Sequence, residues 1–344
     1  MSASAAIKPR VSESAKASPK RLVWHDDEHL QIGDLNLVLS LDEETIHRTQ
    51  STPDQLVLVK NRWLVEDNLA RMPQRVDYMV ELGIFKGGSI AFFEAWYSPT
   101  RLVGLDIRSE RVAALDTYLE RQSANERIKL YYDTDQRDRD ALQRIAQENF
   151  EGRLLDVVFD DGAHRYQASK TSLNVFLPLV RPGGLYVIED WAWAHWPGIS
   201  QQENAASGDY ADQVHPLTKL VFEAVMVAAS RPDVISDVYM DGSRAFLKRG
   251  AADIDHADFD LSRAYLTSLW AMKFELSPGI ARYRDCQEPT RLLKLWRDWV
   301  PLSIRTRVPP QLASLVHRWT GSPRRTRGHS AIEAPFGGHS APES

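Results

Sequence analysis

The sequence of 344 residues has a single cysteine, Cys286, and no run of eighteen apolar residues. One cysteine excludes an internal disulfide framework and a zinc site built from cysteines. The lack of a long apolar run predicts that no helix spans a membrane. The first 21 residues carry charges but no apolar segment, so we expect no secretory signal. These absences favour a soluble protein in a reduced, cytoplasmic setting.

Basic residues are outnumbered by acidic ones in most of the chain but not in its C-terminal part, because the net charge of −5 is unevenly distributed. Residues 281–344 carry 11 Lys and Arg against 5 Asp and Glu, whereas the preceding 280 residues carry 31 against 42. An acidic body lacks the basic face that nucleic-acid binding requires. We therefore expect no nucleic-acid partner, and a distinct role for the basic tail.

The composition divides the chain into five regions. Residues 1–20 and 320–344 are rich in small and polar residues, and we expect a disordered leader and a disordered tail. The other three are an N-terminal region at 21–72 (a hairpin in 21–42, then a helix over 54–72), a domain at 73–250 and a helical, basic extension at 251–319.

Strand and helix patterns alternate through residues 73–250. A helix-length segment follows each of the first four apolar runs, which predicts a parallel sheet with crossover helices. A helix is expected over 213–230, and Asp241-Gly242 then marks the turn of an antiparallel hairpin. The predicted parallel strands are 76–83, 101–107, 128–133, 154–161 and 184–191.

A glycine-rich turn, Glu81-Leu-Gly-Ile-Phe-Lys-Gly-Gly-Ser89, joins the first of these strands to a helix. Its spacing differs from the G-x-G-x-x-G that cradles a pyrophosphate, which disfavours a Rossmann dehydrogenase without excluding it. Asp106 ends the second strand, where an acid can bind ribose hydroxyls in either cofactor class. A plain strand-to-helix turn would also explain any one of these glycines.

Acidic residues gather at the ends of the fourth and fifth strands. Asp160 and Asp161 end the fourth, Glu189 and Asp190 end the fifth, and His164 follows closely. Parallel strands bring such residues to one edge of the sheet, the edge at which open α/β sheets bind ligands. Oxygen ligands favour a hard ion such as Mg²⁺, whereas the alternative for His164 is a local hydrogen bond at the start of a helix.

These motifs resemble known families. Five parallel strands followed by an antiparallel hairpin resemble the class I S-adenosylmethionine (SAM) methyltransferase fold, a Rossmann-like seven-stranded α/β sheet. The segments D-D-G-x-H and P-G-G-x-Y-V-I-E-D are similar to the metal-dependent sugar O-methyltransferases of macrolide tailoring and the cephalosporin hydroxylase-like family around them. The chain departs from the macrolide enzymes at Ala163, where a serine is usual.

The resemblance assigns roles to individual residues. It implies His164 as the general base and SAM and Mg²⁺ as cofactors. Asp106 would hold the ribose of SAM, and Asp135 and Gln136 would flank its adenine, although a solvated loop explains the last two equally well. The resemblance assigns the methionine side of SAM to Glu81, Gly83, Phe85 and Ser89, and it also places Asp160 among the cofactor-binding residues. The metal ligands that it implies are Asp161, Glu189 and Asp190.

The expected function is therefore Mg²⁺-assisted O-methylation of a sugar hydroxyl on a natural product or polysaccharide. The D/N-P-P-Y/F signature of nucleobase methyltransferases is absent. Three alternatives stay open: a hydroxylase-like member of the same family, an NAD-dependent oxidoreductase, and a SAM-binding protein without catalysis.

Two aromatic segments have no settled role. Trp191, Trp193 and Trp196, with His195 and His215, follow the fifth strand and either form the acceptor pocket or fasten the loop to the core. In the tail, apolar Leu292, Leu295, Trp296 and Trp299 lie on one side of a helix, away from Arg291, Lys294 and Asp298. That helix either rests on a membrane surface or docks on its own domain or a second subunit of a homo-oligomer.

Overall fold

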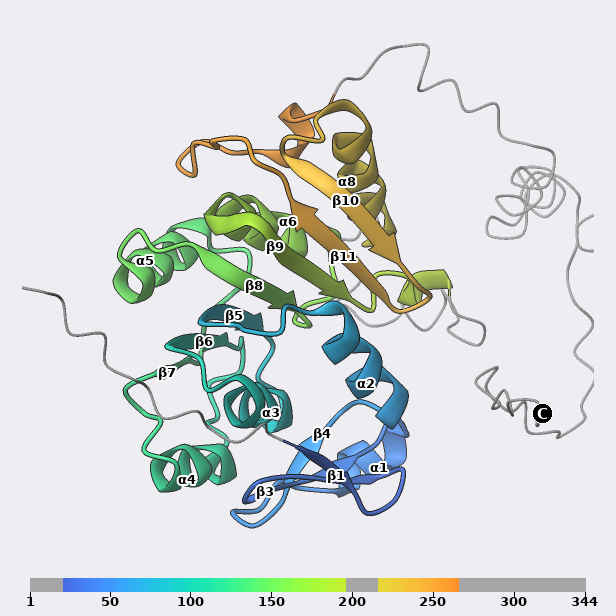
Figure 1. Ribbon diagram of the computed structural model, residues 1–344, viewed down its shortest axis with the longest axis vertical. Coiled ribbons are helices and arrows are strands. Elements are labelled where there is room, and N and C mark those ends of the chain that lie inside the picture. The colour runs from blue at the N-terminus through green and yellow to red at the C-terminus, as the bar shows by residue number, and fades with distance from the viewer. Residues whose placement is uncertain (1–20, 196–215, 266–344) are drawn as a thin grey trace, which may run out of the picture. The chain divides into compact units, whose positions relative to one another are not determined.

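The computed structural model describes residues 21–195 and 216–265, which belong to one compact unit of the chain (Figure 1). A seven-stranded sheet in the order β10-β11-β9-β8-β5-β6-β7 forms its centre. Each predicted parallel strand is present and pairs in parallel with its neighbour. These five strands are β5 (Tyr78–Leu82), β6 (Arg101–Leu105), β7 (Ile128–Tyr131), β8 (Leu155–Asp160) and β9 (Val180–Glu189).

The predicted hairpin consists of β10 (Ile235–Met240) and β11 (Arg244–Arg249), joined at Asp241-Gly242. Strand β11 lies antiparallel to both β10 and β9, and so enters the sheet between them. A parallel sheet with this antiparallel insertion is the strand order of class I methyltransferases. The predicted fold class is confirmed.

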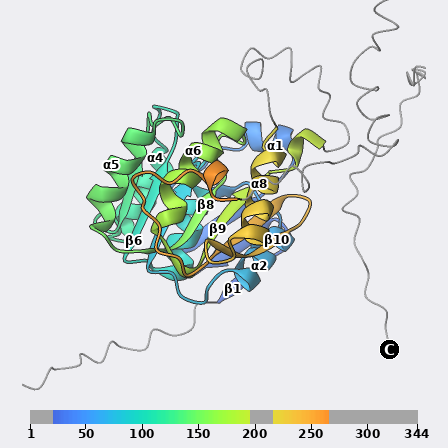
Figure 2. The same cartoon turned by 90° about the horizontal axis from the view of Figure 1, so that it is seen from above.

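Helices cover both faces of the sheet (Figures 1 and 2). Consecutive residues of β5 show why, since Met79 and Val80 point to opposite faces and are both fully buried. Met79 packs in the same cluster as Ile90 and Leu115, and Val80 packs with residues of the opposite layer. The helices are α3 (Gly88–Tyr97) and α4 (Ala113–Arg121) on one face, and α5 (Arg139–Phe150), α6 (Tyr166–Phe176) and α8 (Thr218–Ser230) on the other.

Local sequence accounts for these helices. The α5 helix begins where the Asp138 carboxylate accepts a hydrogen bond from Ala141 N at 3.0 Å, and its apolar positions are spaced to bury one side. Short 3-10 turns complete the domain at η1 (Leu177–Leu179), η2 (Trp193–His195) and η3 (Leu261–Arg263).

A second, four-stranded sheet precedes the first in the chain. The predicted hairpin in 21–42 is present, with Gly33 in the left-handed conformation at the turn. The helix predicted over 54–72 is wrong at its start, because Leu56–Leu58 pairs with the preceding strand and is fully buried. The elements are β1 (Leu22–Trp24), β2 (His29–Ile32), β3 (Leu35–Leu39), α1 (Glu43–Arg48), β4 (Leu56–Leu58) and α2 (Arg62–Arg71).

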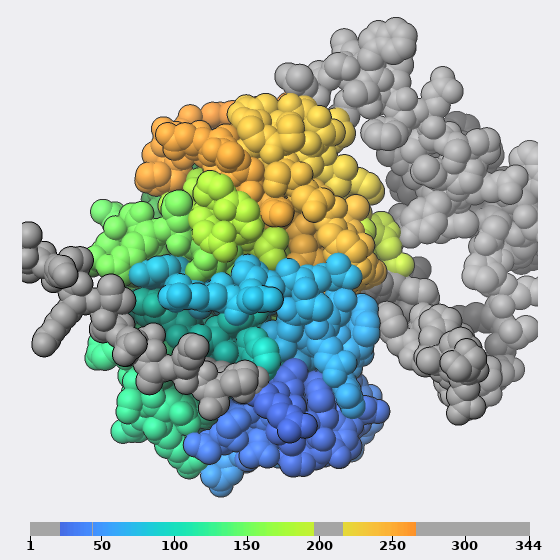
Figure 3. Space-filling model, viewed as in Figure 1, coloured from blue at the N-terminus to red at the C-terminus, as the bar shows by residue number. Residues whose placement is uncertain are grey.

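The two sheets approach closely at the glycine-rich turn. A Cβ on Gly88 would lie 2.1 Å from Val57 O, so only glycine lets β4 pack against the start of α3. Figure 3 shows the N-terminal strands, in blue, packed against the body of the described part, and Arg121 of α4 donates to Pro53 O at 2.7 Å. One of the motif glycines thus serves packing between sheets.

The C-terminal extension is described only up to residue 265. Residues 253–265 were predicted as part of a helical segment, but they contain turns and the single 3-10 turn η3. Asp255 accepts a hydrogen bond from the backbone N–H of Ala257, a local bond that competes with helix formation, whereas Asp260 caps the short turn η3. The rest of the extension, the amphipathic stretch at 290–300, the leader and the tail lie outside the described residues. Within 21–195 and 216–265, no helix has the length and apolar character needed to cross a membrane.

Candidate active site at the carboxyl edge of the sheet

The predicted acidic residues meet at one edge of the large sheet. Strands β8 and β9 are parallel neighbours, with Asp160 opposite Ile188. Asp161 directly follows β8, Glu189 ends β9 and Asp190 comes next. The topology therefore places these three carboxylates where the loops of the carboxyl edge begin, as the sequence predicts.

Asp161, His164 and Asp190 form a cluster whose ligand atoms all lie within 4.8 Å of one another. The His164 Nε2 atom is 3.8 Å from Asp161 Oδ1 and 3.9 Å from Asp190 Oδ2. These distances exceed a direct hydrogen bond, so the imidazole faces both carboxylates across a short gap. Burial raises the pKa of Asp190, an effect that nearby His164 partly offsets.

Backbone strain occurs at this edge, as it does at several helix ends elsewhere in the described residues. His164 and Asp190 have φ angles of +49° and +53°, and Phe85 in the glycine-rich turn has +46°. Such angles are uncommon for residues other than glycine and are held in place by surrounding contacts. The Trp193 indole donates to His164 O at 2.9 Å, and Ser243 Oγ donates to Asp190 Oδ1 at 3.1 Å.

Glu189 lies beside this cluster, where it binds a lysine from the N-terminal region. The Lys60 Nζ atom is 2.5 Å from Glu189 Oε2 and 3.1 Å from Asp161 Oδ2. The lysine side chain is only 5% exposed. Burial alone would lower the pKa of Lys60, but the two carboxylates outweigh it and raise that pKa. Burial and the Asp161 charge raise the pKa of Glu189, although Lys60 opposes them.

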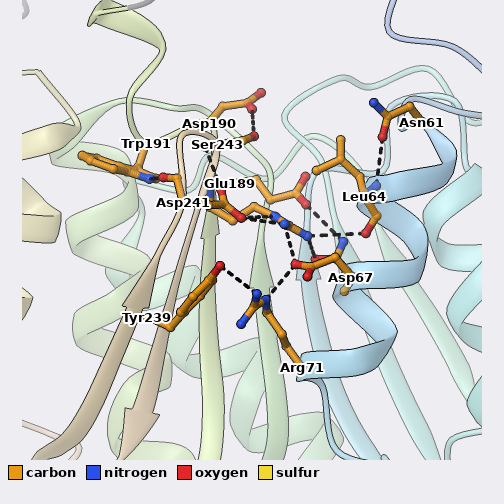
Figure 4. Close-up of polar contacts among 12 residues, drawn as sticks. Asn61, Leu64, Asp67, Arg71, Glu189, Asp190, Trp191, Tyr239, Asp241 and Ser243 are labelled. Atoms are coloured by element: carbon orange, nitrogen blue, oxygen red, sulfur yellow. Dashed lines mark hydrogen bonds and ion pairs between the residues drawn. The ribbon is translucent and has the colours of Figure 1, made fainter. Parts of the chain in front are cut away.

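A polar network behind Glu189 joins α2 to the terminal hairpin (Figure 4). Asn68 Nδ2 contacts Glu189 Oε1 at 3.5 Å, and its own oxygen accepts from Arg244 Nη1 at 2.6 Å. The fully buried Arg244 also donates to Asp67 and Asp241, at 2.7 and 2.6 Å. Arg71 of the same helix donates to Tyr239 OH on the hairpin at 2.7 Å. This network fixes α2, which begins two residues after Lys60.

Sequence reasoning missed Lys60, Asn68 and Arg244. The contacts of Lys60 with Asp161 and Glu189 span 101 and 129 residues. No periodicity or short motif encodes a contact over that separation. The one local signal, a lysine directly after a buried apolar run, also fits an ordinary strand end.

The glycine-rich turn lies next to this edge. A Cβ on Gly83, which has a φ of +99°, would lie 2.3 Å from Asp161 O, so the turn and the loop after β8 touch. The Glu81 side chain beneath the turn is fully buried, and neither carboxylate oxygen has a hydrogen-bond partner among the described residues. Burial raises the pKa of Glu81 to about 8, which nearby Ser89 and Lys60 offset only in part.

Asp106 holds the glycine-rich turn in place. Its Oδ2 accepts from Ile84 N at 3.0 Å and from Phe85 N at 2.8 Å. Arg108 donates to both of its oxygens and also to Phe85 O, and its guanidinium stacks over the Phe85 ring. Burial would raise the pKa of Asp106, but these donors lower it overall. A ribose at Asp106 would have to replace contacts that Arg108 makes.

The residues predicted near the adenine have other partners. Gln136 Nε2 donates to Asp160 Oδ1 at 2.7 Å, and its oxygen accepts from Ala163 N at 3.0 Å. Asp160 is 2% exposed and also accepts from Ser172 and Tyr186, at 3.1 and 3.0 Å. Burial raises its pKa in spite of these donors. Gln136 and Asp160 thus face the interior, whereas half-buried Asp135 binds Arg137.

Two tryptophans after β9 fasten their loop to the protein. Trp191 Nε1 donates to Asp241 O at 2.9 Å, and Trp193 donates to His164 O as described above. These bonds correspond to the second of the two roles considered for the aromatic segment. His195 is exposed, and Trp196 and His215 lie outside the described residues.

Known proteins match the central part of this chain. Residues 80–191 match the family model described as "Methyltransferase domain". Mycinamicin VI 2''-O-methyltransferase of Micromonospora griseorubida is 34% identical over 116 residues, covering 34% of this chain and 26% of that protein. Demethylmacrocin O-methyltransferase of Streptomyces fradiae is 32% identical over 123 residues, covering 36% and 28%. The match thus spans about a quarter of each relative's length.

Among solved structures, MycE methyltransferase from the mycinamycin biosynthetic pathway, in complex with Mg, SAH and mycinamycin VI, is 28% identical. The alignment covers 55% of this chain and 48% of that one, with a TM-score of 0.37. The range of the family match, residues 80–191, includes the carboxyl ends of β5 to β9. This segment thus matches a methyltransferase domain and lies in a sheet with the class I methyltransferase strand order.

Proposed function

We propose that the chain is a SAM-dependent, Mg²⁺-assisted O-methyltransferase acting on a hydroxyl of a sugar-containing natural product or polysaccharide. The observation that carries this proposal is the position of His164 between Asp161 and Asp190. Next to this cluster, the Lys60 ammonium joins Asp161 to Glu189. The names of relatives support the acceptor class, among them L-olivosyl-oleandolide 3-O-methyltransferase of Streptomyces antibioticus, 32% identical over 119 residues.

We propose Asp161, Glu189 and Asp190 as the ligands of Mg²⁺. Two of them already share one cation, the Lys60 ammonium, and two belong to the cluster with atoms within 4.8 Å. Carboxylate oxygens are the donors that Mg²⁺ prefers. When bound, the ion would polarise the acceptor hydroxyl and help to orient it.

We propose that SAM lies along the glycine-rich turn, past Gly83, Phe85 and Ser89. The buried Glu81 carboxylate lacks a partner, which suits the amino group of the methionine moiety. Asp106 would take the ribose hydroxyls in exchange for Arg108 contacts. On the adenine side, Asp135 remains a candidate for direct contact.

Gln136 and Asp160 need a different role in this proposal. Both are buried and hydrogen-bonded to each other, and Gln136 also holds Ala163 N. They would therefore shape the cofactor side by fixing the loop after β8, without touching SAM themselves.

His164 would act as the general base. Its Nε2 would take the proton of the acceptor hydroxyl, and the carboxylates of Asp161 and Asp190 would stabilise the imidazolium formed. The acceptor oxygen then bonds to the methyl carbon of SAM while the carbon–sulfur bond breaks, so S-adenosylhomocysteine leaves. Trp193 holds the backbone of His164 and thereby orients the ring.

The test is the variant His164→Ala, with exposed His256→Ala as its matched control. We expect kcat to fall by about 10²–10⁴-fold in His164→Ala, the usual contribution of a general base, with the Kd for SAM within twofold of wild type. The control should keep wild-type kcat.

Full turnover by His164→Ala would remove this residue from the mechanism, and activity unchanged by EDTA would remove the metal. Binding of NADH in place of SAM by the wild-type protein would favour the oxidoreductase. Turnover that yields a hydroxylated product without methyl transfer would favour the hydroxylase-like alternative.

A further inference from the structure

Lys60 is a buried cation from outside the matched domain. It follows β4, and its backbone N–H donates to Leu58 O at 2.8 Å, which fixes the start of its side chain. The side chain crosses the Phe159 ring of β8, with Nζ 5.4 Å from the ring centroid. Its ammonium then donates to one carboxylate on each of two strand ends.

We propose that Lys60 is a built-in counter-cation that takes the place of the divalent ion in the metal-free protein and lowers the affinity of the site for Mg²⁺ by competition. This inference rests on the proposed metal site formed by Asp161, Glu189 and Asp190.

The partners of Glu189 show why competition follows. Its Oε2 is held by Lys60 at 2.5 Å and its Oε1 faces Asn68 at 3.5 Å. A divalent ion at Glu189 Oε2 would have to displace Lys60 or share that oxygen with it, and an ion at Oε1 would still lie on the same carboxylate as the ammonium. In each case two cations would lie close together, and their Coulomb repulsion would weaken metal binding.

The partners of Asp161 point the same way. Its Oδ2 binds Lys60, whereas its Oδ1 faces His164 and the remaining part of the cluster. Oδ2 of Asp161 thus binds the Lys60 ammonium, and Oδ1 faces the cluster that includes Asp190. A divalent ion held by Asp161 and Glu189 would therefore compete with the ammonium for the same two carboxylates.

The same contacts would hold the acidic edge together when no metal is bound. Buried carboxylates that lie together repel one another unless a cation neutralises them. Lys60 supplies that charge, and the network of Asn68 and Arg244 holds the adjoining helix in position. Lys60 would thereby stabilise the site when no metal is bound, and it would weaken metal binding for the same reason.

The experiment measures Mg²⁺ and Mn²⁺ binding to the full chain by titration calorimetry after EDTA treatment, without SAM or acceptor. The variant Lys60→Met removes the charge and has a side chain of similar length. The variant Lys60→Gln also removes the charge but keeps N–H donors. Two controls are Lys60→Arg, which keeps the charge, and Lys170→Met, which removes a lysine that is 14% exposed and paired with Glu223 at 3.3 Å.

We expect Lys60→Met and Lys60→Gln to bind Mg²⁺ at least about tenfold more tightly than wild type, because a competing positive charge is gone. The two controls should stay within about threefold of wild type. The metal-free Lys60→Met protein should also melt at a lower temperature and gain more from saturating Mg²⁺ than wild type does. If Lys60→Met fails to fold without metal, Lys60→Gln provides the comparison.

Unchanged or weaker Mg²⁺ binding in both neutral variants would overturn the inference while leaving the proposed metal site intact. An equal gain in Lys60→Arg would overturn it too, since the charge would then be irrelevant. If wild type and every variant bind neither ion, the metal site itself is wrong, and the inference is overturned together with that part of the proposed function.

Discussion

Asp160 and Asp161 are consecutive residues at the end of β8, but their surroundings differ completely. Asp160 is 2% exposed and accepts hydrogen bonds from the neutral side chains of Gln136, Ser172 and Tyr186. The Asp161 side chain is 25% exposed, binds the Lys60 ammonium and faces His164. The alternation of side chains along a strand sends the two carboxylates to different sides.

The difference separates a carboxylate that belongs to the fold from one that can change partners. Neutral donors fixed in the interior hold Asp160 in one arrangement. In the proposed site, the lysine beside Asp161 would give way to another cation, which distinguishes Asp161 from Asp160. Glu81 on the neighbouring strand β5 is a third case, buried without any hydrogen-bond donor among the described residues.

The variant Glu81→Gln tests that third case and should give the largest change. Burial raises the Glu81 pKa from 4.5 to about 8, so the folded state binds a proton that the unfolded state releases. The contribution of this group to stability is complete below about pH 4.5 and is lost as pH rises to about 8. Above that pH, Glu81→Gln should be more stable than wild type by about 3–5 kcal/mol.

Urea unfolding at pH 5 and pH 9, without cofactor or metal, measures this difference. The variant should lose less free energy of unfolding than wild type between the two pH values. Equal losses of unfolding free energy in the two proteins would show that a donor hydrogen-bonds to Glu81 in solution. Glu81 would then resemble Asp160, which has such donors.

The variant Asp161→Asn addresses the carboxylate that can change partners. We expect Mg²⁺ affinity to fall roughly 100-fold, or about 3 kcal/mol, because one proposed ligand loses its charge. The free energy of unfolding should change by less than about 1 kcal/mol, since the substitution also relieves repulsion from Glu189. Calorimetric titration and urea unfolding measure the two quantities. Wild-type affinity in Asp161→Asn would contradict the proposed ligand set.

The matched variant Asp160→Asn should show the reverse pattern, with a moderate loss of stability and little change in metal affinity. An amide in place of the carboxylate turns one acceptor into a donor beside other donors, which costs about 1–3 kcal/mol of stability. Mg²⁺ affinity should stay within twofold of wild type. A loss of metal affinity equal to that of Asp161→Asn, with stability unchanged, would erase the distinction between the two residues.

The large sheet was predictable because its parallel strands are short, mostly apolar segments. The turn at Asp241-Gly242 likewise identified the hairpin, and both features are local. Strand β4 was not recognised, since three apolar residues before a helix look like the first turn of that helix. Its pairing with β3 depends on contacts that a local pattern does not contain.

The site was predictable only to the level of which residues reach the edge. Sequence placed Asp161, Glu189, Asp190 and His164 there, since parallel strands end together. It could not tell that Asp160 and Gln136 turn inward, because the face that a side chain occupies at a strand end depends on register. Lys60 escaped notice because its partners lie more than 100 residues away.

The position of Lys60 in the chain has a consequence for how this protein can be divided. The amine that neutralises Asp161 and Glu189 lies at residue 60, before the matched segment at 80–191 begins. A transplant of that segment alone would carry the carboxylates without their partner. We therefore expect the affinity for the ion to depend on the N-terminal region as well as on the carboxylates. In chimaeras between relatives, exchange of that region alone would change the affinity, although the carboxylates stay the same.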